Sequence, residues 1–137
     1  MKTILVLLLV IDLANLIYGH VPVKVPEDQK ARTAQIAAEC IAQEKITPEQ
    51  AIEFSKGEFT KADKNVKCYA NCFLTKAGVV VDGVVQTSVV MEKMGPTVGE
   101  EKLKATMEKC SKLKGSDHCE TAFMMFECYH KEHADIA

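Results

Sequence analysis

Six cysteines are the residues of this chain with the most specific chemistry. An even number of cysteines in a short chain indicates a closed set of disulfides. Zinc is the alternative, with histidines as further ligands, but structural zinc sites usually repeat a gap of two to four residues between ligands, and only one pair of cysteines has such a gap. We therefore expect three disulfides, no metal and no other cofactor. The cysteines are Cys40, Cys68, Cys72, Cys110, Cys119 and Cys128, separated by 27, 3, 37, 8 and 8 residues.

The first 19 residues decide whether these cysteines reach an oxidising compartment. Lys2 precedes an unbroken apolar run that is followed by a small residue near the end of the segment. This is the layout of a secretory signal peptide. A membrane anchor is the alternative, but Asp12 and Asn15 interrupt a run already too short to cross about 30 Å of hydrocarbon. We expect residues 1–19 to be a signal peptide and residues 20–137 to form one secreted, extracellular domain.

The composition narrows the possible partners. The 137 residues include 17 Lys and Arg and 19 Asp and Glu, which leaves a net charge of −2. There is no basic patch for nucleic acid and no polybasic run for a membrane surface, so neither partner is expected and the mature chain should not insert into a membrane. Tryptophan is absent, and methionine must help to fill an interior that adapts to different shapes.

Most of the chain reads as short helices with clear start and stop signals, which predicts an all-α fold of about six helices. Thr47 and Gln50 have the spacing of a capping box around Pro48. Gly95 and Pro96 should end one helix. The first expected helix begins near Pro26. The other five run from Thr47 to Gly57, Asp63 to Ala77, Gln86 to Met94, Thr97 to Leu113 and Asp117 to His133.

Residues 79–85 can be read in two ways. Valines on both sides of Asp82 and Gly83 are a hairpin signature. An isolated two-stranded hairpin is marginally stable, however, and no other strand pair is visible in the sequence. We therefore interpret this stretch as an extended turn between two helices.

Helix geometry limits how the cysteines can pair. Cys119 and Cys128 are separated by roughly 13.5 Å along one helix and by half a turn around it, so they cannot bond each other. Cys68 and Cys72 lie on one face with nearly parallel side chains, and a bond between them would be strained. Six cysteines allow fifteen pairings, and ten of these contain neither bond. Spacing cannot choose among those ten.

The cysteine pattern behind a signal peptide resembles that of the six-cysteine odorant-binding proteins of insects, the pheromone and general odorant-binding protein family. The resemblance covers about residues 25–130. It implies the pairing Cys40–Cys72, Cys68–Cys119 and Cys110–Cys128. It also implies a compact array of helices around an apolar cavity, and a carrier without enzymatic activity that takes odorants or pheromones through aqueous fluid to olfactory receptors.

The expected cavity should be lined by apolar side chains from four helices, because disulfides can hold a shell around an open centre that accepts an apolar guest. Polar contacts are harder to place. Thr75 should share the core-facing side of Cys68, where its hydroxyl could bond a ligand, although a bond back to the carbonyl four residues earlier is slightly favoured. Tyr69 and Tyr129 are further candidates. The expected apolar wall residues are Phe73, Leu74, Val89, Val90, Met94, Leu103, Met107, Phe123, Met124 and Phe126.

The tail after Cys128 could fold over the pocket as a short lid. His130 and His133 titrate near neutral pH if unperturbed, which raises the hypothesis that acid loosens the lid and releases the ligand. The simpler interpretation, which we favour, is a pair of solvated surface histidines.

Three other functions are compatible with parts of the sequence. A secreted phospholipase needs a His-Asp pair beside helix cysteines, and Asp117-His118 is the one adjacent pair, but Asp117 is better explained as a helix cap. A secreted protein-binding factor would need an exposed apolar patch. A carrier of other lipids or semiochemicals in a non-olfactory fluid is the alternative within the carrier class. Ligand identity, tissue and oligomeric state, including a homodimer, stay open.

Overall fold

The computed structural model describes residues 29–133, and this part of the chain is almost entirely helical. The expected all-α fold with about six helices is confirmed. The signal peptide, the start near Pro26 and residues 134–137 of the tail lie outside the described residues. The elements are α2 (Lys30–Glu44), α3 (Pro48–Ser55), α4 (Lys64–Lys76), β1 (Val80–Val81), β2 (Val84–Val85), α5 (Thr87–Val98), α6 (Glu100–Cys110) and α7 (His118–Glu132).

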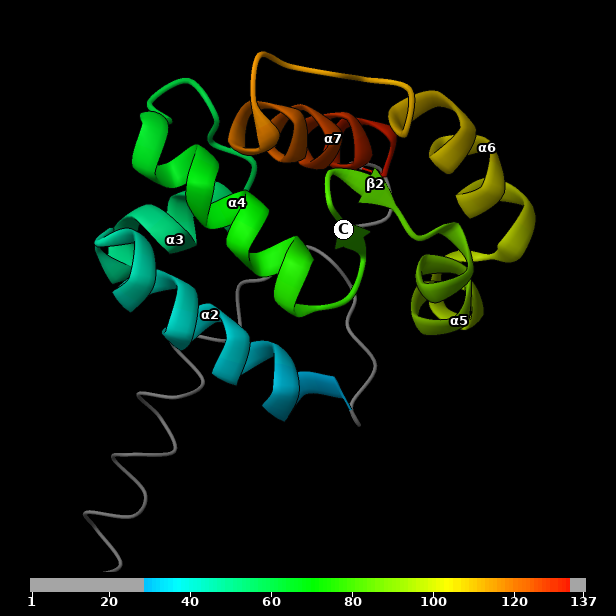
Figure 1. Cartoon of the computed structure of the whole chain (residues 1–137). Helices are drawn as coiled ribbons and strands as arrows, with labels where there is room; N and C mark the ends of the chain where they lie inside the picture. The colour runs from blue at the N-terminus through cyan, green and yellow to red at the C-terminus, as the bar shows by residue number, and fades with distance from the viewer. Residues whose placement is uncertain (1–28, 134–137) are drawn as a thin grey trace, which may run out of the picture.

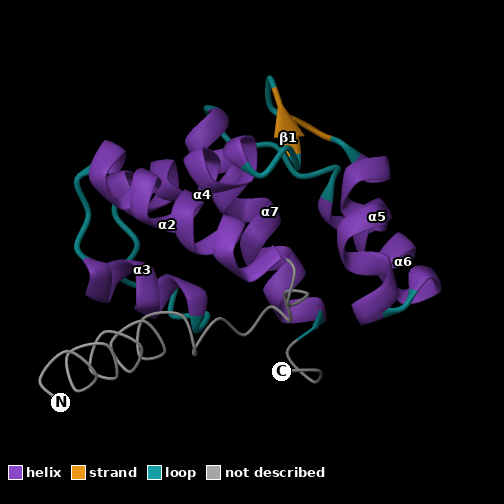
Figure 2. Ribbon diagram, turned by 90° about the horizontal axis from the view of Figure 1, so that it is seen from below, coloured by secondary structure: helices purple, strands orange, loops and turns teal. Residues whose placement is uncertain are grey.

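Helices α4 and α7 form the centre of the fold. The two pack along each other, and α2 packs against α4 (Figure 1). Helix α3 joins this group, which we call the body: α2, α3, α4 and α7. At the far end, α5 and α6 lie side by side and pack mainly on each other (Figure 2). The described chain therefore consists of a body and a helix pair that meet at α7.

Capping residues start three helices where the sequence signals indicate. Thr47 and Gln50 form a complete capping box, in which the Gln50 amide donates to the Thr47 hydroxyl over 3.1 Å and the Thr47 amide donates to Oε1 of Gln50 over 2.9 Å. Asp63 accepts a hydrogen bond from the Val66 amide at the start of α4. Asp117 accepts one from the backbone amide three residues later, which begins α7. Each bond satisfies a donor that the first helical turn leaves unpaired.

The extended turn expected at residues 79–85 is instead a short hairpin. Val80 pairs with Val85 and Val81 with Val84 in antiparallel register. The turn has positive φ at both central residues, as a two-residue hairpin requires, and an Asp-Gly pair supplies it. The hairpin does not stand alone, because β1 contacts α4 and Val80 is buried. Packing on a helix therefore stabilises a strand pair that would be marginal in isolation.

The boundary between α5 and α6 also differs from the expectation. Helix α5 does not end at Gly95 and Pro96 but continues to Val98. Pro96 lies in the last turn of α5, so the hydrogen bond that its missing N–H cannot make is lost only at the end of the helix. Thr97 does not cap α6, which begins at Glu100 behind Gly99, a residue with φ of +101°. The same helix ends at Cys110 rather than near Leu113.

The apolar interior is divided into two clusters of buried residues. The first fills the body and the second lies in the helix pair, where it is reinforced by half-buried residues of the hairpin and of α7. The first comprises Ile36, Cys40, Ile46, Ala51, Phe54, Val66, Tyr69, Ala70, Cys72, Ala122 and Phe123; the second comprises Val90, Leu103 and Met107.

Gly57, just after α3, touches α7 so closely that a side chain should not fit. Its φ is +88°, and an added Cβ would overlap the ring of His130. We expect Gly57→Ala to lower the free energy of unfolding by about 2–3 kcal/mol, from backbone strain and overpacking together. Gly78 has φ of +77° but open space around it, so Gly78→Ala should cost only about 1 kcal/mol. Urea unfolding checks both; equal losses would mean that the His130 ring moves aside freely.

Candidate ligand-binding site

The ten apolar wall residues expected from the sequence do not all belong to one group. Four helices carry them, as expected, but they are divided between the two clusters. Val89 and Met124 are half-buried and belong to neither cluster. Phe123 belongs to the body cluster, and Phe73, Leu74 and Phe126 pack against it. Val90, Leu103 and Met107 form the cluster of the helix pair, and Met94 packs against that cluster.

Burial separates these residues into two roles. Leu103 is fully buried, and the side chains of Val90, Met107 and Phe123 are also enclosed by protein atoms. Their surface is already covered, so they hold the framework of each cluster. The remaining residues keep apolar surface that a ligand could cover, which is worth about 25 cal/mol for each Å² removed from water. This half-buried set is Phe73, Leu74, Val89, Met94, Met124 and Phe126.

The position expected for Thr75 is wrong. Seven residues after Cys68 it was expected on the core-facing side, but the side chain is exposed near the end of α4. Seven residues fall only about 20° short of two full turns, so Thr75 does lie on nearly the same side of α4 as Cys68. Cys68 itself is only half-buried, however, and Thr75 lies in the last turn of α4, where the side chain is exposed.

Two tyrosines considered as polar contacts occupy different clusters. Tyr69 is buried in the body, with its ring edge-on to Phe54 at 5.9 Å between centroids. Tyr129 is half-buried and packs on the cluster of the helix pair. Burial raises the pKa of each phenol to about 12, so both are neutral at physiological pH. Tyr129 is the one of the two that adjoins the helix pair.

The histidines of the tail are not a solvated pair. His133 is buried, and both of its ring nitrogens lack a hydrogen-bond partner. His130 is half-buried with its ring 5.5 Å from that of Phe59. Sequence reasoning placed both on the surface, although Phe126, Tyr129 and His133 recur at a spacing of three and four residues, which marks one face of a helix. The lid was expected from the whole tail after Cys128, but residues 129–132 continue α7 and His133 ends it, and residues 134–137 lie outside the described residues.

Burial of His133 predicts a pH-dependent stability. Burial lowers the pKa of its imidazole, Lys102 lowers it further, and Glu132 opposes both weakly. The neutral form is therefore favoured in the folded state, so its stabilising effect is complete above the unfolded pKa of about 6.5 and declines as the pH falls from there toward the folded pKa. We expect urea stability to fall between pH 7 and pH 5.5 in the wild type, and by less in His133→Phe. Parallel declines in the two proteins would assign the effect to other groups.

A lysine that the sequence did not single out joins α5 to the body. Lys93 is half-buried, and its ammonium donates a 2.7 Å hydrogen bond to the carbonyl of Ala77, which caps the end of α4. A cation at a helix C-terminus is favoured by the partial negative charge of the unpaired carbonyls. The bond therefore fastens the helix pair to α4, near the half-buried apolar residues of both elements.

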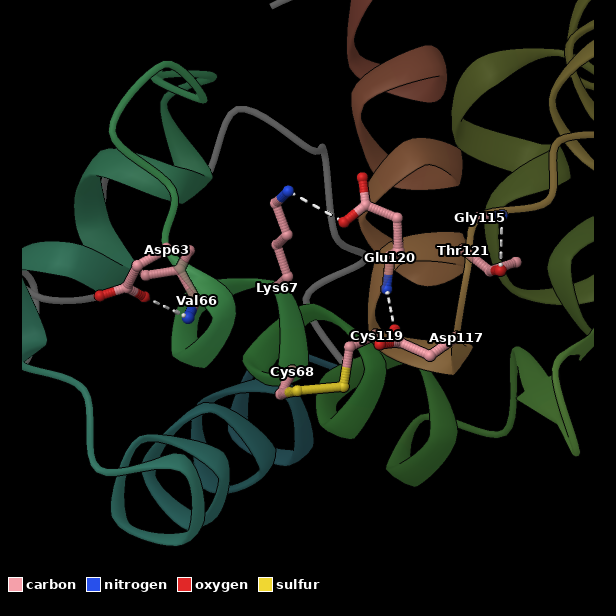
Figure 3. A network of polar contacts seen from close by, with 9 residues as sticks. All are labelled: Asp63, Val66, Lys67, Cys68, Gly115, Asp117, Cys119, Glu120 and Thr121. Carbon is pink, nitrogen blue, oxygen red and sulfur yellow. Dashed lines mark hydrogen bonds and ion pairs between the residues drawn. A yellow bond between two sulfur atoms is a disulfide. The ribbon is translucent and has the colours of Figure 1, made fainter.

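A charged pocket on the surface of the body does not fit an apolar ligand. It is lined by Lys64, Lys67, Asp117, Cys119 and Glu120. Its charges are largely paired, since Lys67 lies 2.9 Å from the carboxylate of Glu120, beside the disulfide of Cys119 (Figure 3). The ammonium of Lys67 also lies 5.2 Å from the centroid of the Phe123 ring. These contacts hold α4 against α7.

The three disulfides connect the helices in the pairing that the family resemblance implies. Cys40–Cys72 joins α2 to α4, and Cys68–Cys119 joins α4 to α7. Cys110–Cys128 joins α6 to α7 and so links the helix pair to the body. Residues 23–132 match the model of the PBP/GOBP family. The chain belongs to that family.

Individual relatives agree with this assignment. General odorant-binding protein 56a of Drosophila melanogaster is 40% identical over 103 residues, which cover 75% of this chain and 74% of the relative. Odorant-binding protein 10 of Aedes aegypti is 33% identical over 99 residues, 71% and 70% of the two chains. The solved structure of the fatty acid binding protein OBP56a from the oral disk of the blowfly Phormia regina matches with a TM-score of 0.71, 40% identity and coverage of 82% and 97%.

No helix within residues 29–133 is long and apolar enough to cross a membrane. All six cysteines form disulfides, so none is left as a nucleophile or a metal ligand. The fold, the cross-links and the relatives are those of an odorant-binding protein, a carrier of small hydrophobic ligands.

Proposed function

We propose that this protein is a secreted carrier that holds a small hydrophobic ligand where the helix pair adjoins the body. The observation that carries the proposal is the division of the apolar residues into two clusters, with half-buried residues of α4, α5 and α7 packed against them. A ligand at this position would cover apolar surface of Leu74, Met94 and Met124. Methionine side chains adapt to ligands of several shapes.

Long-chain fatty acids are the ligand class we favour, together with odorants and pheromones of similar shape. The 40% identical blowfly structure is called a fatty acid binding protein. That protein comes from the oral disk, which favours the second candidate function, a carrier in a fluid other than that of the olfactory organs. Delivery to an olfactory receptor is the alternative destination.

Secretion and the absence of catalysis complete the proposal. Residues 1–19 would direct the chain out of the cell and be removed, leaving residues 20–137 as the carrier domain. Transport needs no chemical step. The interpretation as a protein-binding factor is less favoured, because the exposed large apolar side chains among the described residues are confined to Val81 and Val84 at the hairpin.

Displacement of a fluorescent probe tests the proposal. The purified protein should bind N-phenyl-1-naphthylamine and release it to dodecanoic acid or 1-dodecanol. Met94→Gln should weaken dodecanol binding by about tenfold, because a buried amide without a partner opposes the apolar chain. Val84→Gln places the same amide on the exposed hairpin and should change nothing. A protein that binds neither the probe nor these ligands is not a carrier.

A further inference from the structure

His133 is a buried polar side chain without a partner at the end of α7. It is 8% exposed, and neither Nδ1 nor Nε2 makes a hydrogen bond. Leaving a buried donor or acceptor unpaired usually costs about 1–3 kcal/mol, so such groups are rare in folded proteins and call for an explanation. The position of His133 does not explain why its ring is buried and unpaired, because a side chain just beyond the last turn of a helix can usually turn toward water.

The surroundings of His133 belong to the helix pair. Its ring lies 4.5 Å from the ring of Tyr129, which packs on the cluster formed by Val90, Leu103 and Met107. The Tyr129 hydroxyl makes no hydrogen bond to the protein within residues 29–133, but unlike the His133 nitrogens it is not a buried unpaired atom. A buried imidazole without a partner and an accessible hydroxyl therefore adjoin an apolar cluster, and sites that bind an apolar chain with one polar end combine the same groups.

The charged residues near His133 do not satisfy its ring. Lys102 and Glu132 influence it electrostatically. Glu132 forms an ion pair with Lys109, and Lys102 is exposed. Neither residue hydrogen-bonds the imidazole. The ring thus keeps one donor and one acceptor for another molecule.

We infer that His133 anchors the polar head of the ligand, with Tyr129 beside it, and that the head is a hydroxyl or a carboxyl group. This rests on the proposed carrier function. The imidazole N–H donates to the oxygen of an alcohol or carboxylate, or the unprotonated nitrogen accepts from a hydroxyl. The apolar chain of the ligand then extends over the half-buried residues of the helix pair, among them Met94 and Val98.

Two ligands of equal chain length test this anchor. Wild-type protein should bind 1-decanol about tenfold more tightly than 1-chlorodecane, which has no hydroxyl. His133→Phe keeps an aromatic ring without donor or acceptor and should bind both within twofold of each other. His118→Phe makes the same exchange at the exposed start of α7 and should keep the tenfold preference. An undiminished preference in His133→Phe would overturn the inference.

Nuclear magnetic resonance of ¹⁵N-histidine protein gives a second test that needs no variant. Addition of 1-decanol should shift the ring nitrogens of His133 and leave those of His118 unchanged, whereas 1-chlorodecane should shift neither. Unshifted His133 resonances in a protein that binds decanol would overturn the anchor and leave the carrier function intact. If neither ligand displaces the fluorescent probe, the proposed function itself fails and the anchor fails with it.

Discussion

Replacement of Cys110 and Cys128 together by alanine should weaken ligand binding by more than roughly tenfold. Their disulfide is the covalent link between the helix pair and the body. Helix α5 packs mainly on α6, so without the link the pair keeps α7, the hairpin and the Lys93 hydrogen bond as its main attachments. Binding of a ligand would then have to fix the helix pair against the body, and the free energy spent on this ordering weakens the measured affinity.

A different disulfide provides the control. Cys40 and Cys72 join α2 to α4 inside the body, across a sequence separation of 32 residues, whereas 18 residues separate Cys110 from Cys128. In the chain-entropy model the body disulfide contributes about 3.7 kcal/mol and the pair disulfide about 3.2 kcal/mol. Replacement of Cys40 and Cys72 by alanine should therefore lower the free energy of unfolding at least as much as replacement of Cys110 and Cys128. It should nevertheless leave ligand affinity within about twofold of the wild-type value.

The two variants separate a stability effect from a positioning effect. Both should be compared at low temperature, where circular dichroism shows that each is folded, by urea unfolding and by probe displacement. If affinity falls equally in both, the disulfides act through global stability alone. If it falls in neither, the helix pair is held to the body well enough without its covalent link.

Local signals in the sequence predicted the helices that begin with a cap. Thr47 with Gln50, Asp63 and Asp117 each supply an oxygen to a backbone amide within the next three residues, so their effect depends on neighbouring sequence alone. The same local geometry excluded a bond between Cys119 and Cys128. It could not choose among the remaining pairings, since that choice depends on which helices meet, and only the family resemblance supplied it.

Features that depend on tertiary contacts were missed. The hairpin around Val80 forms because β1 packs on α4, and no local pattern reveals that support. Pro96 stays inside α5 because it stands so near the helix end. The burial of His133 and the contact of Lys93 with Ala77 arise where distant segments meet. The division of the expected wall residues into two clusters has the same origin, since periodicity identifies a buried face but not its partner.

Phe54→Ala should lower the free energy of unfolding by about 3–5 kcal/mol, a large part of the 5–15 kcal/mol typical of a folded domain. Phe54 is 3% exposed, so its ring is surrounded by protein atoms. Four other rings lie around it, at centroid distances from 4.3 to 6.2 Å, and each aromatic pair adds about 0.5–1.5 kcal/mol beyond the burial of area. These neighbours are Phe59, Tyr69, Phe123 and Phe126.

The aromatic group around Phe54 joins three helices of the body, because its members come from α3, α4 and α7 and from the loop before α4. Truncation to alanine leaves a cavity that rigid, cross-linked helices cannot easily close, which places the loss toward the upper end of the range. Val81→Ala removes apolar atoms at a residue that is 51% exposed and should cost less than about 0.5 kcal/mol. Urea unfolding of both variants with disulfides intact measures the difference. A loss below 1 kcal/mol for Phe54→Ala would mean that the neighbouring rings collapse into the space, so that packing in the body is adaptable rather than rigid.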